Sequence, residues 1–223
     1  MVKGEQFNSW RSVGHAAQAA RIYAARGCDE LVLLDIGATA EGDGPDLRKI
    51  EAWTEGNFCP ITVGGGVRSA EDVRNLLAAG ADKVSINSAA LANPRLITEA
   101  AERFGSQCVV VSVDAMRVPG KKLWNVCAHG GRRIGDLDVM DWVKKMEAAG
   151  AGEILLTSVD QEGTLSGYDL ELIQAVSAAV NIPVVAHGGC SGRENMLEAV
   201  RAGAHAVAAG ALFLFKDIVP LDC

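Results

Sequence analysis

Short apolar runs alternate along the chain with longer stretches in which apolar residues recur every three or four positions. The clearest run is CVVVSV at Cys108–Val113. A continuous apolar run of this length is typical of a strand buried on both faces, whereas the longer spacing is typical of a helix with one buried face. The predicted strands are Glu30–Ile36, Pro60–Val63, Lys83–Ile86, Cys108–Val113, Glu153–Thr157, Pro183–Ala186 and Ala206–Ala209.

The stretches between these strands have the periodicity of amphipathic helices. Buried strands that alternate with helices indicate βαβ units and a parallel sheet. A short hairpin strand is also expected at Leu123–Val126, and Lys216–Cys223 is a possible start of a last helix. The predicted helices are His15–Arg26, Pro45–Thr54, Ala70–Ala79, Pro94–Phe104, Val139–Ala149, Leu170–Val180 and Arg193–Ala202.

The two halves of the chain repeat one another at a constant offset. Gly80-Ala81 recurs as Gly203-Ala204, which is an offset of 123 positions. The same offset relates three further pairs of short motifs. Four matches at one offset are not expected by chance, and they indicate two similar half-barrels. Those pairs are Cys59-Pro60 with Ile182-Pro183, Gly65-Gly66 with Gly188-Gly189, and Glu30-Leu31 with Glu153-Ile154.

These patterns predict an α/β fold, the TIM (β/α)₈ barrel, built from two half-barrels in a single domain over residues 1–223. The barrel has eight strands, but the chain supplies seven predicted core strands, so we expect the first strand to be missing and the domain to be incomplete at both ends. The missing strand would leave unpaired edges beside Glu30–Ile36 and Ala206–Gly210, which favours aggregation or pairing with another chain.

The composition narrows the class of protein. The formal net charge of -7 argues against a nucleic-acid or anionic-membrane surface. No apolar run reaches the length of a membrane span and no secretory signal precedes the first helix, so we expect a cytoplasmic protein. The cysteines lack the spacing of a metal site and are expected to be buried, reduced thiols; no metal or cofactor is predicted. They are Cys28, Cys59, Cys108, Cys127, Cys190 and Cys223.

Two glycine-rich turns carry the strongest sign of a ligand. Thr62–Gly66 (TVGGG) ends one strand, and Ser85–Ser88 (SINS) ends the next. Glycines let backbone N–H groups approach a phosphate closely, and Asn87 and Ser88 add side-chain donors. The repeat supplies a second set, formed by QEGT at Gln161–Thr164, HGG at His187–Gly189 and AAG at Ala208–Gly210. A substrate with a phosphate at each end would span the barrel mouth between them.

Ionisable residues fall at both ends of the predicted strands. Asp114 follows CVVVSV, at the carboxyl end where barrel enzymes place acid–base groups, and Asp35 ends its strand in a similar way. Either aspartate could instead cap a helix or organise a loop. The strand-start residues Glu30, Lys83 and Glu153 could form a charged ring at the opposite end of the barrel or a structural salt-bridge layer. His187 is a possible ligand contact, and the other three histidines are expected at the surface or in loops.

Several longer stretches resemble HisF, the cyclase subunit of imidazole glycerol phosphate synthase. The resemblance runs from about Val2 to Phe215. The related HisA barrels share the glycine turns but lack the SINSAAL and GAGEILLTS sequences, so these two motifs are specific to HisF. The matching stretches are DELVLLDIGAT, TVGGGVRSAEDVRNLLAAGADKVSINSAAL, FGSQCVVVSVDAMRV, GAGEILLTSVDQEGTLSGYD and IPVVAHGGC.

The resemblance implies a ribulose-phosphate-binding barrel and a cyclase reaction that uses ammonia. Ammonia from a HisH-type glutaminase, docked at the N-terminal face as a heterodimer, passes through the barrel to a bis-phosphorylated ribulosyl-formimino nucleotide. The products are imidazole glycerol phosphate and aminoimidazole carboxamide ribotide. Asp114 matches one of two catalytic aspartates, and Lys3 matches a substrate-loop lysine. The other implied residues are Gly66, Asn87 and Ser88 for one phosphate, Gly163, Gly188, Gly189, Ala209 and Gly210 for the other, and Glu30, Lys83 and Glu153 for the ammonia gate.

The chain also departs from that family. The first strand, with its catalytic aspartate and gate arginine, is absent, and several ligand-facing positions differ, namely Gly37, Glu162, His187 and Gly210. The segment KGEQFNSWR at Lys3–Arg11 resembles instead the HisF paralogues called WbuZ, which are associated with amidation of sugars in surface-polysaccharide pathways. A third hypothesis, a non-catalytic phosphate-binding remnant or partner protein, follows from the missing strand.

Overall fold

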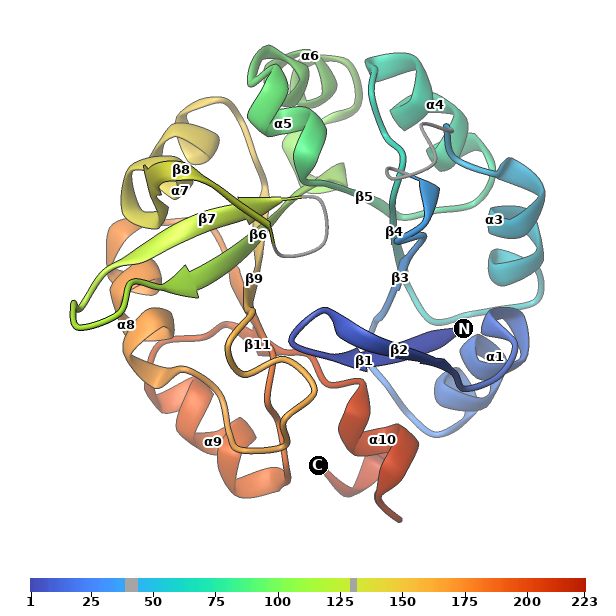
Figure 1. Cartoon of the computed structure of the whole chain (residues 1–223). Helices are drawn as coiled ribbons and strands as arrows, with labels where there is room; N and C mark the ends of the chain where they lie inside the picture. Colours follow the sequence, from blue (N-terminus) through green and yellow to red (C-terminus); the bar gives the residue numbers. More distant parts are fainter. Residues whose placement is uncertain (39–43, 129–131) are drawn as a thin grey trace.

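The computed structural model describes residues 1–38, 44–128 and 132–223, with the side chains of 3–4, 8–11 and 132–135 left outside the description. Its centre is a curled sheet of parallel strands in the order β11-β10-β9-β6-β5-β4-β3. Figure 1 looks into the ring that these strands form, with the helices outside it. The bounds are β3 Leu31–Leu34, β4 Ile61–Gly64, β5 Lys83–Ile86, β6 Val109–Arg117, β9 Glu153–Ser158, β10 Val184–His187 and β11 Ala206–Val207.

The predicted strands and helices are confirmed, with boundaries that differ by a few residues at most positions. The predicted helices correspond to α1 Ala16–Ala25, α3 Leu47–Thr54, α4 Ala70–Ala78, α6 Arg95–Phe104, α7 Val139–Ala148, α8 Leu170–Ala179 and α9 Arg193–Arg201. The shorter helices α5 Ser88–Ala92 and α10 Ala211–Phe215 were not predicted. Neither were the 3₁₀ turns η1 Ser106–Cys108 and η2 Pro220–Asp222. Lys216–Cys223 therefore begins no α-helix, because Pro220 lacks the N–H that would continue one and only the 3₁₀ turn forms.

Side-chain caps explain where several of the helices start. Ser69 Oγ accepts from the N–H of Asp72 at 3.1 Å, and the Asp72 carboxylate accepts from the N–H of Ser69 at 3.0 Å, which makes a capping box at α4. Asp138 and Asp169 cap α7 and α8 in the simpler way. The caps fix the first turn of each helix relative to the strand that precedes it.

Antiparallel hairpins lie at the carboxyl ends of the strands. The long β6 continues into β7 Trp124–Ala128, which pairs with β8 Arg132–Asp138. The hairpin strand predicted at Leu123–Val126 is confirmed by β7, whereas β8 was not predicted. The hairpin of β1 Val2–Glu5 and β2 Asn8–Ser12 was not predicted either. It crosses the opening of the ring in Figure 1 and lies against the loop after β9, where Gln6 N–H donates to the Glu162 carbonyl at 2.8 Å.

The structure carries the sequence repeat into three dimensions. Element starts recur at the same offset of 123 residues, as Ala16 of α1 and Val139 of α7 illustrate. The two hairpins are also counterparts, so each half has a hairpin, a helix and a series of βα units. Further matched starts are Leu47 with Leu170, Ile61 with Val184, Ala70 with Arg193, and Ser88 with Ala211.

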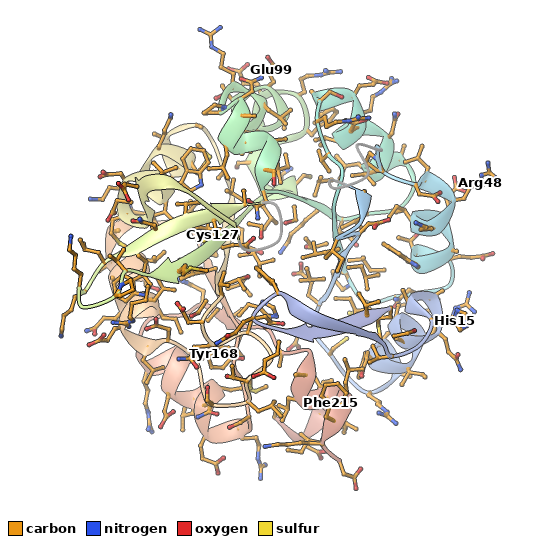
Figure 2. All side chains as sticks on the ribbon, in the orientation of Figure 1. His15, Arg48, Glu99, Cys127, Tyr168 and Phe215 are labelled. Atoms are coloured by element: carbon orange, nitrogen blue, oxygen red, sulfur yellow. The ribbon has the colours of Figure 1, made fainter. Side chains whose placement is uncertain are left out.

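Alternation along the strands separates the core from the barrel interior. In β6, Val109, Val111 and Val113 belong to the main hydrophobic cluster with the helices, so Ser112 and Asp114 face the other way, into the barrel. Figure 2 places the labelled charged residues of the helices on the outer rim, while Cys127 lies among the strands. The strands therefore carry the polar residues that face a common interior.

The sheet is open between β3 and β11. Among residues 1–38, 44–128 and 132–223, the outer edges of these two strands pair with no further strand. A cavity of about 740 Å³ lies there, lined by apolar residues of the strands and the flanking helices. The fold is a TIM-barrel-type α/β fold in which seven parallel strands alternate with helices, as predicted. Members of the cavity wall include Leu31, Leu33, Leu155, Val185, Val207, Ala20 and Met196.

Candidate active site at the carboxyl ends of the strands

Asp114 lies at the mouth of the barrel, inside β6 rather than after it. The residue is 8% exposed, and Asn87 Nδ2 donates to its Oδ2 at 2.8 Å. Burial raises the pKa of Asp114 to about 7; the hydrogen bond from Asn87 lowers it, and the charge of Glu162 raises it. A carboxyl group that titrates near neutral pH is suited to both accepting and donating protons.

The first glycine turn brings two strands into close contact. A Cβ on Gly65 would lie 2.2 Å from the carbonyl oxygen of Asp35, and φ is +104° at Gly65 and +69° at Gly66. Only glycine fits such a position without a shift of the backbone. Asn87 and Ser88 lie at the start of α5, after the neighbouring strand β5. The structure therefore brings Gly66, Asn87 and Ser88 to one edge of the mouth.

Asp35 takes the loop-organising role. Its Oδ1 accepts from the N–H of Gly37 at 3.2 Å, and its Oδ2 forms an ion pair with Lys49 at 3.1 Å. Both of its oxygens are thus engaged by its own loop and by α3. The alternative of a second acid–base aspartate at this position receives no support from these contacts.

The second glycine turn repeats the first. A Cβ on Gly188 would lie 2.7 Å from the Ser158 carbonyl oxygen, and one on Gly189 would lie 2.1 Å from the Gly167 carbonyl oxygen. Five predicted phosphate-site residues line one small cavity of about 10 Å³, close to the space of one water molecule. These five are Gly163, Gly188, Gly189, Ala209 and Gly210.

Glu162 belongs to the second glycine-rich set, but the sequence predicted no role of its own for it. The residue is buried, lines the second cavity and acts on Asp114 through its charge. Its Oε2 lies 3.6 Å from Nε2 of His187. The signal in the sequence was its place directly before Gly163, where the resembled family has aspartate. The second turn thus holds an acid and a histidine in addition to its glycines.

Lys3 is placed only by its backbone. It lies in β1 opposite Arg11 of β2, and its side chain is outside the described residues. The same hairpin reaches the mouth through Gln6, whose Nε2 donates to the Asp160 carbonyl at 2.9 Å. The predicted substrate contact of Lys3 stays a prediction.

The three predicted gate residues meet at the opposite end of the strands. Lys83 Nζ lies 2.8 Å from Glu30 Oε2 and 2.8 Å from Glu153 Oε2, and Thr62 donates to Glu30 Oε1 at 2.5 Å. Burial opposes the charge of Lys83, but its hydrogen bonds to Glu153 and Glu30 outweigh that effect and raise its pKa. The cluster holds two carboxylates and one ammonium group, so it carries a net charge of about −1.

The remaining predictions concern metals, membranes and thiols. In the described part of the chain, no group of three or more metal-ligating side chains occurs, and no helix is long and apolar enough to cross a membrane. All six cysteines are free thiols, but the expectation of general burial is wrong because only Cys127 and Cys190 are buried. Cys28 and Cys59 lie with their sulfur atoms 3.4 Å apart. His15 and His205 are exposed, and His129 lies outside the described residues.

One comparison with known proteins bears on this site. A family model described as "Histidine biosynthesis protein" matches residues 1–219, which is nearly the whole chain. That family covers enzymes of the HisA and HisF types, which are isomerases and cyclases. The match agrees with the curled parallel sheet, the paired glycine turns and the buried Asp114 at the mouth. The chain therefore belongs to the histidine biosynthesis protein family.

Proposed function

We propose that the chain is a HisF-type cyclase that uses ammonia from a glutaminase partner. The substrate would be the bis-phosphorylated ribulosyl-formimino nucleotide, and the products imidazole glycerol phosphate and aminoimidazole carboxamide ribotide. The observation that carries this proposal is the Glu30–Lys83–Glu153 cluster, which lies at the opposite end of the same sheet from Asp114. An isomerase that works at the mouth alone has no need of polar groups at the far end of its barrel.

The strands connect the two ends directly. β5 begins at Lys83 and leads to Asn87, and β9 begins at Glu153 and leads to Thr157, the register partner of Asp114. In the proposed reaction, the partner docks at the N-terminal face and the charged cluster admits ammonia to the interior. Asp114 would then exchange protons with the substrate at the mouth, where its pKa of about 7 leaves both protonation states populated.

The glycine turns fit the two ends of such a substrate. Each turn presents close-packed backbone, and the first adds the side chains of Asn87 and Ser88. Backbone N–H groups in glycine-rich turns are common phosphate ligands, since no side chain keeps the oxygens away. A protein with a net charge of -7 needs such local donors to hold a doubly phosphorylated ligand.

A second candidate is ammonia delivery for sugar amidation. The hairpin segment that resembles the amidation paralogues packs on the loop that carries Glu162, because Gln6 donates to the carbonyls of both Glu162 and Asp160. The second glycine turn also carries Glu162 and His187 near its cavity. These contacts favour an acceptor that differs from the nucleotide at that end.

The test is turnover of the nucleotide with ammonium salts as the nitrogen source. We expect imidazole glycerol phosphate from the wild-type chain and a loss of about 10²–10⁴-fold in kcat for Asp114→Asn, because one acid–base group is removed. Asp35→Asn is the matched control and should keep most of the rate, since its carboxylate is held by Lys49 and Gly37. If the wild type forms no product while it still binds the nucleotide, the cyclase proposal is wrong and the phosphate-binding remnant is favoured.

A further inference from the structure

His187 stands at the end of β10 and faces the barrel interior. Val184 and Ala186 belong to hydrophobic clusters on the outer side, whereas Val185 and His187 line the large interior cavity. His187 is the register partner of Thr157 on β9, and Thr157 is the register partner of Asp114 on β6. The side chains of Asp114, Thr157 and His187 therefore form one row along the wall of the mouth.

Two neighbours hold the imidazole ring in place. Its Nδ1 lies 3.2 Å from Thr157 Oγ1, and its Nε2 lies 3.6 Å from Glu162 Oε2. The side chain of His187 is 25% exposed and that of Glu162 is 9% exposed. A nearly buried carboxylate beside one ring nitrogen orients the ring and compensates a positive charge on it. The ring is thus anchored and still open to the interior and to the second glycine cavity.

The repeat shows that the fold does not require this histidine. Its counterpart in the first half, at the offset of 123, is Gly64. A Cβ on Gly64 would lie 2.8 Å from the Leu34 side chain and from the Ser85 carbonyl oxygen, so the first half has no room for a side chain there. In the second half, the equivalent position has room for a side chain, and an ionisable residue, His187, occupies it at the mouth.

We infer that His187 is a second acid–base residue of this site and that Glu162 is its positioning residue. The inference rests on the proposed function, because ring closure needs one group to accept a proton and another to deliver one. Asp114 and His187 stand two strands apart, or about 10 Å, so a reacting segment that lies over Thr157 can reach both. The protons balance: the nitrogen that comes from ammonia loses an N–H proton to Asp114 as its bond to carbon forms, and the oxygen or nitrogen that leaves that carbon takes a proton from the imidazolium of His187. Both groups then exchange protons with water.

The decisive experiment compares His187→Asn and His187→Ala with the wild type in the nucleotide–ammonium assay. We expect kcat to fall by about 100-fold or more in both, with KM changed by less than about threefold. Added imidazole should restore part of the rate to His187→Ala and none to His187→Asn, which keeps the space filled. His15→Asn, a change at an exposed histidine, is the control and should leave kcat unchanged.

Two results would overturn the inference. One is full kcat in both variants; the other is a rise in KM alone, which would make His187 a binding contact. Glu162→Gln should lower kcat less than the His187 changes, by about 10-fold, since Glu162 acts only through the ring of His187 and through the pKa of Asp114.

A second readout separates this inference from the proposed function. Long-range ¹⁵N spectra of the histidine rings need no substrate. We expect Glu162→Gln to move the Nε2 signal of His187 and Thr157→Val to move its Nδ1 signal, because each partner faces one nitrogen. If both signals stay in place, the ring is not anchored as inferred and the assignment fails, even if the wild type makes imidazole product. If they move and the wild type makes no product, the proposed cyclase reaction is wrong while the Glu162–His187 pair stands.

Discussion

The two glycine turns share a backbone and differ in their side chains. Gly65 packs against the Asp35 carbonyl, and Gly188, at the offset of 123, packs against that of Ser158. In both turns φ is close to +100°. The close approach of two strands leaves room only for glycine. Packing therefore explains why both halves keep a glycine at this position although the rest of their sequences differ.

The polar side chains of the two turns come from different strands of the repeat. The first turn has Gly64 and gains its polar side chains from Asn87, whereas the second has His187 and carries Gly210 at the position of Asn87. A position that faces the mouth is free of the packing constraint that preserves the turn glycines. Similar backbones can therefore receive different ends of one substrate, and the side chains decide which end each receives.

The largest expected effect concerns Asp114, which lies where the two halves meet. Its pKa is raised to about 7 in the folded protein, so its contribution to stability is complete at acidic pH and is lost as the pH rises through about 7. At pH 8 we expect Asp114→Asn to be more stable than the wild type by up to about 4 kcal/mol. Urea unfolding at pH 8 measures the difference, which should vanish below pH 4.

Asp35→Asn provides the contrast for that measurement. Its carboxylate is paired with Lys49 and partly exposed, so its loss should give no gain at pH 8. A gain of similar size in both variants would show that general surface charge, rather than the buried carboxylate at the mouth, sets the stability at this pH.

Periodicity predicted the barrel well because its strands are continuous apolar runs and its helices have one apolar face. The run CVVVSV at Cys108–Val113 falls in β6 from its second residue on, and the period of Ala70–Ala79 matches α4. The hairpin of β1 and β2 escaped prediction because KGEQFNSWR has no regular alternation, and its pairing depends on contacts with the loop after β9. Short α5 and α10 were missed because five residues are too few to show a period.

The candidate site was predictable in position and less so in chemistry. Strand ends located Asp114, and strand starts located the cluster of Glu30, Lys83 and Glu153. The sequence placed Glu162 and His187 in the same glycine-rich set, but it could not predict the contact between their side chains, which depends on the register of β9 and β10. Contacts of this kind depend on the fold rather than on spacing along the chain.

The next largest effect is a loss of stability, and it tests whether close packing requires glycine in the two turns. Gly65→Ala would put a Cβ 2.2 Å from backbone oxygen, against 2.7 Å for Gly188→Ala, and both would keep a left-handed backbone. We expect losses of about 3–4 kcal/mol and about 2–3 kcal/mol in the free energy of unfolding, measured in urea. Gly120→Ala, at φ +73° with nothing within 4 Å, should lose only about 1 kcal/mol. Equal losses at all three positions would mean that φ alone, and no close approach, keeps glycine there.

The smallest effect is also the most direct measure of how the two halves differ. Asn87, from the first half, lowers the pKa of Asp114 through its hydrogen bond, while Glu162, from the second half, raises it through its charge. Asn87→Ala should therefore move the titration midpoint of the Asp114 carboxyl upward, and Glu162→Gln should move it downward, each by about 0.5–1 pH unit. Carbon-13 NMR of the carboxyl group follows both without any substrate.

The opposite signs are what matter in that titration. If burial alone governed the pKa of Asp114, both variants would leave the midpoint near 7. A downward shift in both would mean that the Asn87 contact favours the neutral acid, so that both halves would raise the pKa of Asp114. Opposite shifts would mean that each half holds one control on the same carboxyl: the first favours the base that accepts a proton, and the second favours the acid that returns it.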